Sequence, residues 1–277
     1  MKRKIILAVA PVSLSAPEGA DSPVSPAAVA QDVVRCALSG ASIVHLHVRD
    51  DAGEQTGDLH CFDKTLRAIR SCSDIVIQGS TGGLTTLSLA ERCVSVTHPL
   101  TQSASLNIGS VNFGEGVYVN TLPDIRYWCE QMVKHHVAAE MEVFDLSMVR
   151  VGQMLLKKGL VAHAQFNICL GFEWALPATW RALSSMALEV GLGSVEGASF
   201  GVIHHGMEDM TLLAAAVGMG ANMIRVGYED SAWLEHGVIA PSNETLVKRA
   251  ASLIRAMGCE VATPADARKM LHIPKES

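Results

Sequence analysis

The stretch Ile43-Val44-His45-Leu46-His47-Val48-Arg49-Asp50 decides the fold. Side chains alternate between the two faces of a strand, so His45, His47 and Arg49 share one face and three apolar side chains share the other. The apolar face is typical of a strand that packs against helices. Two histidines on the opposite face indicate a polar interior, which an ordinary buried sheet does not have.

Outward from this stretch, short β-branched runs alternate with amphipathic segments along nearly the whole chain. The expected strands are Ile5–Ala10, Ile43–Val48, Ile75–Gly79, Ala104–Ile108, Ala139–Phe144, Ala162–Ile168, Gly197–Ile203 and Met223–Gly227. The expected helices are Ser25–Leu38, Phe62–Cys72, Asp124–His136, Ser147–Lys158, Pro177–Val190, Asp209–Val217 and Asn243–Met257. Eight such units predict an α/β fold, a (β/α)₈ TIM barrel in one domain spanning residues 1–277. The alternative is an open doubly wound sheet, but this chain lacks the glycine-rich turn that follows the first strand of such a fold.

Composition excludes several classes of protein. The 277 residues are 49% hydrophobic and 5% aromatic with a net charge of −6, which excludes disorder and argues against a nucleic-acid partner. The seven cysteines are scattered without a C-x-x-C pair and predict free thiols in a reducing cytoplasm. The basic, apolar start resembles a signal peptide, but Pro11 interrupts the run and a buried first strand is favoured. No apolar stretch is long enough to span a membrane.

Polar side chains recur at period two on five of the expected strands. They are His45, His47 and Arg49, then Ser105 and Asn107, Glu140 and Glu142, His163, Gln165 and Asn167, and finally Arg225 with Glu229 just beyond its strand. Buried ionisable groups are costly unless they are paired or bound to a metal. These residues therefore predict a polar pocket at the carboxyl ends of the barrel strands.

The His45-Leu46-His47 motif is a candidate metal site. Residues i and i+2 of a strand point the same way, so both imidazoles can reach one ion. Two hydrogen-bonded core histidines are the alternative. Glu229 would supply a third ligand, and two histidines with one carboxylate leave a coordination position open, as catalytic zinc requires. Iron, cobalt or nickel would also suit this set.

Each of the remaining polar motifs has two interpretations, one structural and one functional. Arg225 and Asp230 form either a structural ion pair or a substrate-binding guanidinium beside a carboxylate base. The loop at residues 78–83 is either an ordinary turn or a cradle of hydroxyls and backbone N–H groups for an anion. Glu142 either binds a polar substrate group or pairs with Arg49. The pair at residues 204–205 is expected to be loop histidines with satisfied hydrogen bonds rather than substrate contacts.

Five motifs together resemble the β-keto acid cleavage enzyme (BKACE) family over nearly the whole chain. They are the stretch at residues 43–50, Gly79-Ser80-Thr81-Gly82-Gly83, residues 105–114, Glu140-Met141-Glu142-Val143, and Ile224-Arg225-Val226-Gly227-Tyr228-Glu229-Asp230. The resemblance implies a zinc-dependent (β/α)₈ barrel, usually a homotetramer. It implies a reaction in which a β-keto acid and acetyl-CoA give acetoacetate and a new acyl-CoA by a Claisen and retro-Claisen route.

The resemblance also implies roles for individual residues. One Zn²⁺ per subunit is expected on His45, His47 and Glu229, and Arg225 with Asp230 would abstract a proton. Substrate contacts are expected from Ser80, Thr81, Gly82, Ser105, Asn107, Glu142 and Leu14. A family member with an amino-substituted substrate has a glutamate shortly after its first strand, where this chain has Ser13 and Leu14. We therefore expect a neutral or apolar acyl tail that contacts Leu14.

Two other functions remain open from the sequence. A zinc hydrolase of the amidohydrolase type is also a barrel with an H-x-H motif, but it carries that motif on its first strand rather than its second. A barrel that holds a metal and binds a metabolite without turnover is the alternative outside enzymes.

Overall fold

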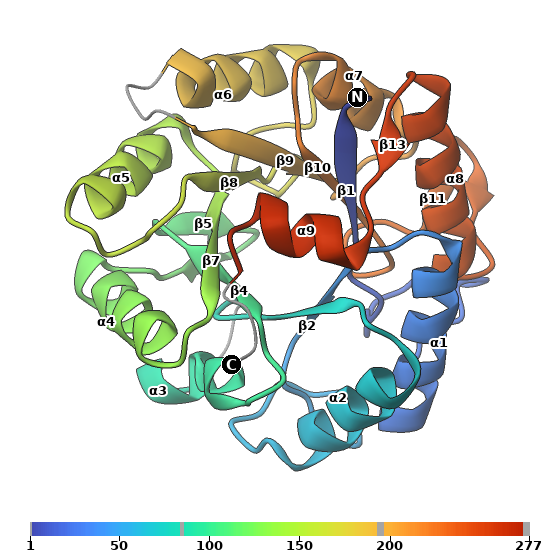
Figure 1. Ribbon diagram of the computed structural model, residues 1–277, viewed down its shortest axis with the longest axis horizontal. Coiled ribbons are helices and arrows are strands. Elements are labelled where there is room, and N and C mark those ends of the chain that lie inside the picture. The colour runs from blue at the N-terminus through green and yellow to red at the C-terminus, as the bar shows by residue number, and fades with distance from the viewer. Residues whose placement is uncertain (1, 84–85, 193–196, 274–277) are drawn as a thin grey trace.

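The structure is a computed structural model that describes residues 2–83, 86–192 and 197–273. In these ranges eight parallel strands close into a barrel (Figure 1). They are β1 (Lys4–Val9), β2 (Ile43–Leu46), β3 (Val76–Gly79), β4 (Ser103–Asn107), β7 (Ala138–Val143), β8 (Gln165–Ile168), β9 (Ser199–Ile203) and β10 (Met223–Val226). The barrel closes because β10 pairs in parallel with β1. The predicted (β/α)₈ barrel is confirmed.

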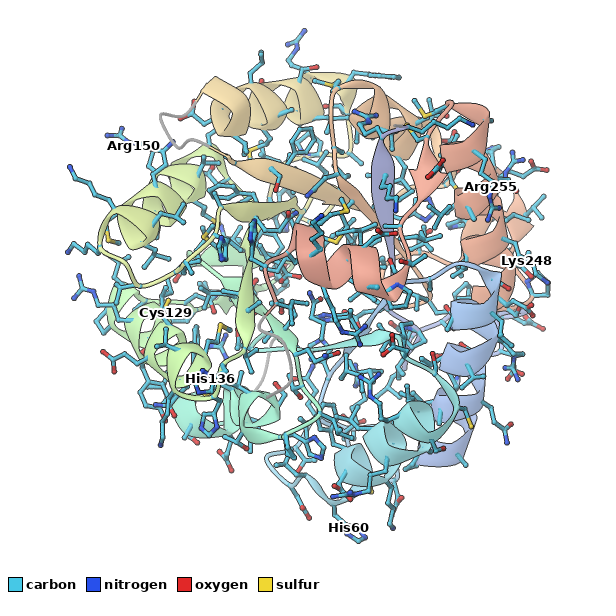
Figure 2. All side chains as sticks on the ribbon, viewed as in Figure 1. His60, Cys129, His136, Arg150, Lys248 and Arg255 are labelled. Atoms are coloured by element: carbon cyan, nitrogen blue, oxygen red, sulfur yellow. The ribbon has the colours of Figure 1, made fainter. Side chains whose placement is uncertain are left out.

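Helices surround the barrel and cover its outer face. The larger ones are α1 (Pro26–Ser39), α2 (His60–Cys72), α4 (Leu122–Lys134), α5 (Leu146–Lys157), α6 (Trp180–Leu192), α7 (Thr211–Gly218) and α8 (Asn243–Ala256). In α4, Ile125, Trp128 and Met132 are buried at helical spacing against the strands. Figure 2 shows charged side chains such as Lys248 and Arg255 of α8 pointing outward from this ring. Each helix therefore buries one stripe and leaves the other in solvent.

The amino-terminal end of the barrel is closed by the last helix of the chain. After α8 the chain forms β13 (Glu260–Val261), which pairs with the start of β1, and then α9 (Pro264–Met270). In Figure 1 α9 lies across the centre of the ring of strands. Ala267 and Leu271 pack there against Ile6, Ile43 and Met223 from the barrel interior. In the described part of the chain, this packing fills the amino-terminal end of the barrel.

Short elements lie in the connections between barrel strands. The β3–β4 connection holds α3 (Leu89–Arg92) and the 3₁₀ helix η1 (Val94–Thr97). Two antiparallel hairpins follow β4 and β10: β5 (Val111–Phe113) with β6 (Gly116–Tyr118), and β11 (Trp233–Glu235) with β12 (Val238–Ile239). In the described ranges no helix is both long and apolar enough to cross a membrane.

Two residues expected to point into the barrel do not. Strand β8 begins at Gln165, so His163 precedes the barrel; it is exposed, and its ring stacks on His272 with centroids 3.8 Å apart. Strand β2 ends at Leu46, and Arg49 lies in the following loop, where it donates to the Gly53 carbonyl at 2.8 Å. Both predictions were wrong because the alternation was extended beyond the paired part of each strand.

Candidate active site

A cavity of about 500 Å³, counted with its open mouth, lies at the carboxyl ends of the barrel strands. Nine of the residues singled out in the sequence line it: His45, His47, Ser80, Gly82, Asn107, Glu142, Arg225, Glu229 and Asp230. They come from β2, β4, β7, β10 and the loops that follow strands. The barrel thus gathers these nine residues into one pocket, whereas Glu140, Gln165 and Asn167 are buried but do not line it.

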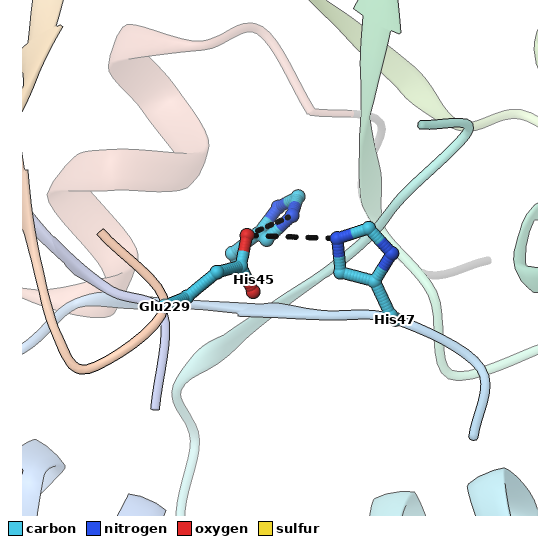
Figure 3. Close-up of side chains that lie close together, drawn as sticks. All are labelled: His45, His47 and Glu229. Atoms are coloured by element: carbon cyan, nitrogen blue, oxygen red, sulfur yellow. Dashed lines mark ion pairs between the residues drawn. The ribbon is translucent and has the colours of Figure 1, made fainter. Parts of the chain in front are cut away.

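Two imidazoles and one carboxylate converge in this pocket (Figure 3). Oε1 of Glu229 lies 3.5 Å from Nε2 of His45 and 3.5 Å from Nε2 of His47. One candidate ligand atom from each residue falls within 4.8 Å of the others. Two ligand atoms bound tetrahedrally to one ion at about 2.0–2.1 Å would lie roughly 3.3 Å apart. The spacing and the donor types therefore fit a divalent metal such as zinc.

A buried hydrogen-bond network orients His45. Its Nδ1 lies 2.8 Å from Oε1 of Gln78, whose amide nitrogen donates to Glu140 at 3.0 Å. Asn167 donates to the second oxygen of Glu140 at 2.8 Å. Because Oε1 of Gln78 can only accept, Nδ1–H of His45 donates this hydrogen bond, and the Nε2 lone pair of His45 is left to face the cavity. Gln78 and Glu140 thus fix the orientation of the His45 ring through hydrogen bonds on the side away from the cavity.

The protonation states of His45 and Glu229 favour metal binding at this site. Burial lowers the pKa of His45 to about 3, so its imidazole is neutral at physiological pH. Burial alone would raise the pKa of Glu229, but the neighbouring His47 and His45, together with Arg225, hold it below its ordinary value. A neutral imidazole and an ionised carboxylate are the forms that bind a metal ion.

Arg225 contacts all three acidic side chains that line the cavity. It holds Asp230 through two hydrogen bonds of 2.8 and 2.6 Å and donates to Glu142 at 3.2 Å. Its Nη2 also lies 3.5 Å from Oε1 of Glu229. Burial raises the pKa of Asp230 to about 6 and that of Glu142 to about 7, despite the arginine. The partner of Glu142 is therefore Arg225 and not Arg49.

The loop after β3 is closed by hydrogen bonds within the protein. The N–H of Gly82 donates to Ser80 Oγ at 3.0 Å, and that of Gly83 donates to the Tyr118 hydroxyl at 3.0 Å. These two N–H groups are therefore not free to cradle an anion. The Ser80 hydroxyl makes a long contact of 3.5 Å with the Ser105 hydroxyl, in which either oxygen can donate, and the buried Asn107 has an amide oxygen without a hydrogen-bond partner. Ser80 and Asn107 are thus the groups left to contact a ligand.

Three predicted contact residues lie outside the cavity lining. Thr81 is fully buried and donates to the Ser105 carbonyl at 2.8 Å, and the Ser105 hydroxyl lies 3.5 Å from that of Ser80. Thr81 and Ser105 therefore stabilise the loop after β3 without lining the cavity. Leu14 is 48% exposed in the β1–α1 loop, where it approaches Gly53.

Aromatic residues that the sequence analysis missed form the rest of the pocket. Phe113, Tyr118, Phe144 and Phe172 all line the cavity. The first two lie on the β5–β6 hairpin, whose alternating strands flank a glycine-containing turn, a pattern that predicts a hairpin. His205 lines the cavity, and burial lowers its pKa to about 4. The expectation of loop histidines with satisfied hydrogen bonds is met only in part. His204 is fully buried and its Nε2 is bonded to the Asp209 carbonyl, but its Nδ1 has no partner among the described residues.

A tight turn after β10 presents Glu229 and Asp230. Gly227 has a φ of +134°, and a Cβ atom there would lie 2.2 Å from the carbonyl oxygen of Ala10. The N–H of Glu229 donates to the same Ala10 carbonyl at 3.1 Å. Glycine at residue 227 therefore allows β10 to approach β1 closely where the two acidic residues emerge.

Gly227→Ala is expected to lower the free energy of unfolding by about 3 kcal/mol or more, because backbone atoms of Ala10 cannot move cheaply. Gly220→Ala is the matched control. Gly220 also has a positive φ, +107°, but its Cβ would meet no atom within 4 Å, so a loss of only about 1–2 kcal/mol is expected. Urea unfolding measures both. Equal losses would show that the contact with Ala10 is not decisive.

Comparisons with known proteins point to one family. The family model of BKACE, beta-keto acid cleavage enzyme, matches residues 4–273. A 3-keto-5-aminohexanoate cleavage enzyme of Acetoanaerobium sticklandii is 37% identical over 254 residues, covering 88% of this chain and 90% of that protein. A 3-oxoadipate:acetyl-CoA acetyltransferase of Cupriavidus necator is 31% identical over 292 residues, covering 99% and 96%. The solved ternary complex of ObcA with a C4-CoA adduct and oxalate matches with a TM-score of 0.76 at 18% identity. It covers 91% of this chain and 67% of that one, and shows the shared fold.

The fold and the pocket define a (β/α)₈-barrel enzyme with its polar site at the carboxyl ends of the strands. The chain belongs to the β-keto acid cleavage enzyme family, as its motifs predicted. The hydrolase and the non-catalytic barrel are thereby set aside.

Proposed function

We propose that the enzyme transfers the acyl group of a β-keto acid to coenzyme A, using acetyl-CoA and releasing acetoacetate, with Zn²⁺ on His45, His47 and Glu229. The observation that carries the proposal is that this triad and the Arg225–Asp230 pair meet in one cavity. Relatives named as acetyl-CoA-dependent transferases support acetyl-CoA as the second substrate.

The first chemical task is removal of a proton from C2 of the β-keto acid. Zinc, when bound, withdraws electrons from the keto group and makes the C2 protons more acidic. The Asp230 carboxylate, held in place by Arg225, accepts the proton. The guanidinium stabilises negative charge that develops on the substrate. The Ser80 hydroxyl and the Asn107 amide NH₂ donate hydrogen bonds to the substrate carboxylate and orient C2 toward Asp230.

The remaining steps exchange the two acyl groups. The C2 carbanion attacks the acetyl carbonyl carbon, a new C–C bond forms, and the coenzyme A thiolate leaves. That thiolate then attacks the original keto carbon, and the bond from this carbon to C2 breaks. The released C2 carbanion takes back the proton from Asp230. The products are acetoacetate, whose C1 and C2 come from the β-keto acid, and the new acyl-CoA.

Incubation of the purified enzyme with β-keto acids and acetyl-CoA tests the proposal. Acetoacetate and a new acyl-CoA should form in equal amounts, measured by chromatography with mass detection. Omission of acetyl-CoA is the matched control and should abolish product formation. Cleavage of a β-keto acid without acetyl-CoA would contradict the proposal.

We also propose a homotetramer, as the family resemblance implies. Light scattering coupled to size exclusion would give the mass directly. The cytoplasmic location stays a prediction.

A further inference from the structure

One wall of the cavity is a set of packed aromatic rings. It comprises Phe113 on β5, Tyr118 on β6, Phe144 after β7 and Phe172 in the β8–α6 loop, all of which line the cavity. We call these four residues the aromatic wall. The proposed chemistry acts on the carboxylate, C2 and keto carbon of the substrate and uses none of these rings. The wall is therefore free to contact the part of the substrate that differs between β-keto acids, the acyl tail.

The rings of the wall pack on one another and do not form an open cage. Phe172 is stacked on Phe113 with centroids 4.8 Å apart and on His205 with centroids 3.5 Å apart. Both faces of Phe172 are thus covered. Phe144 meets the rings of Phe113 and Phe172 edge to face at 5.4 and 5.1 Å. An ammonium group needs an open ring face within about 6 Å. Phe172 does not offer one, so this ring presents its apolar edge to a tail.

The charged groups of the cavity are already committed to one another. Arg225 binds Asp230 and Glu142, and Glu229 lies between the two metal-ligand histidines. His205, stacked on Phe172, also lines the cavity, but burial lowers its pKa to about 4 and keeps it neutral. The described residues that line the cavity include no other carboxylate, guanidinium or ammonium group. A second charge on the substrate would therefore be buried there without a partner, which is unfavourable.

From these contacts we infer that the enzyme selects β-keto acids with a neutral, apolar acyl tail, which packs against the aromatic wall. The inference rests on the proposed function and adds the substrate class to it. It replaces the exposed Leu14 by Phe113 and Phe172 as the expected contacts of the tail.

Three substrates of similar size and different charge test the inference on the wild-type enzyme. They are 5-methyl-3-oxohexanoate, which is neutral in its tail, 5-amino-3-oxohexanoate, which is cationic, and 3-oxoadipate, which is anionic. With acetyl-CoA, kcat/KM for the neutral tail should exceed both others by roughly 30-fold or more, as expected for an unpaired buried charge. A charged tail used as well as the neutral one would overturn the inference while the proposed function stands. Acetoacetate from none of them would overturn both.

Phe172→Leu and Phe113→Leu test the contact itself. Each should lower kcat/KM for 5-methyl-3-oxohexanoate by about 10-fold. Each should change the exchange of labelled acetyl-CoA into acetoacetate, whose tail is one methyl group, much less. A general folding defect would lower both reactions equally, and equal losses or no loss would overturn the inference. Trp174→Leu is the control, because Trp174 lies in the same loop as Phe172 but is 68% exposed and outside the cavity lining.

Discussion

Asp230→Asn is expected to lower kcat/KM for acyl transfer by about 10³-fold. The amide keeps the size of the side chain but cannot accept the C2 proton. It also disturbs the double hydrogen bond with Arg225, because its NH₂ group would face a donor. The loss should appear mainly in kcat, measured from initial rates of acyl-CoA formation at saturating acetyl-CoA.

Asp58→Asn is the matched control for that substitution, because Asp58 is exposed in the loop before α2. It should leave the rate unchanged. Circular dichroism and thermal unfolding of both variants would separate a chemical loss from a folding loss. An Asp230→Asn enzyme that keeps more than a tenth of the wild-type kcat/KM would show that another group is the base.

His47→Ala is expected to lower the metal content from one ion per chain to a small fraction of that, and to lower kcat/KM by at least about 10²-fold. Nε2 of His47 is one of the three candidate ligand atoms, and two remaining ligands hold zinc poorly. Elemental analysis after dialysis gives the number of ions per chain and identifies the metal. It therefore also distinguishes zinc from iron, cobalt or nickel.

His60→Ala is the control for the metal measurement. His60 is exposed at the start of α2 and points away from the barrel (Figure 2). One ion per chain should remain bound to this variant. A His47→Ala protein that still binds one ion, or that remains fully active without metal, would be inconsistent with the proposed site.

The part of the site that strand periodicity controls could be predicted from the sequence. His45 lies on β2 and His47 lies one residue beyond its end, where the alternation of the strand still holds, so both point into the pocket. Glu229 follows the last barrel strand, and it reaches the histidines because β10 pairs with β1, which in turn pairs with β2. The expectation of a closed barrel was therefore enough to bring these three residues together.

The contacts made across the barrel interior could not be predicted in this way. Arg225 on β10 binds Glu142 on β7, although β8 and β9 lie between these strands in the sheet. Spacing along the chain ranks no pair of inward residues above another, so Arg49 was an equally good partner for Glu142. Side-chain length and the curvature of the barrel decide which pair meets.

The contacts made by the loops and by the carboxyl-terminal helix could not be predicted from the sequence either. Phe113 and Phe172 belong to two connections distant in sequence, and their stacking depends on how those connections fold over the barrel. The closure of the amino-terminal end by α9 depends on Ala267 and Leu271 meeting inward residues of several strands. Neither arrangement leaves a periodic signal in the sequence.

Isotope labelling tests the central claim most directly. The enzyme would be incubated with acetyl-CoA carrying ¹³C at both acetyl carbons and with unlabelled 5-methyl-3-oxohexanoate, and the products analysed by ¹³C NMR and mass spectrometry. The account predicts acetoacetate labelled at C3 and C4 only, with an unlabelled 3-methylbutanoyl group on coenzyme A. Labelled acetate together with 5-methyl-3-oxohexanoyl-CoA would mean simple transfer of coenzyme A without carbon–carbon bond exchange, and would contradict the account.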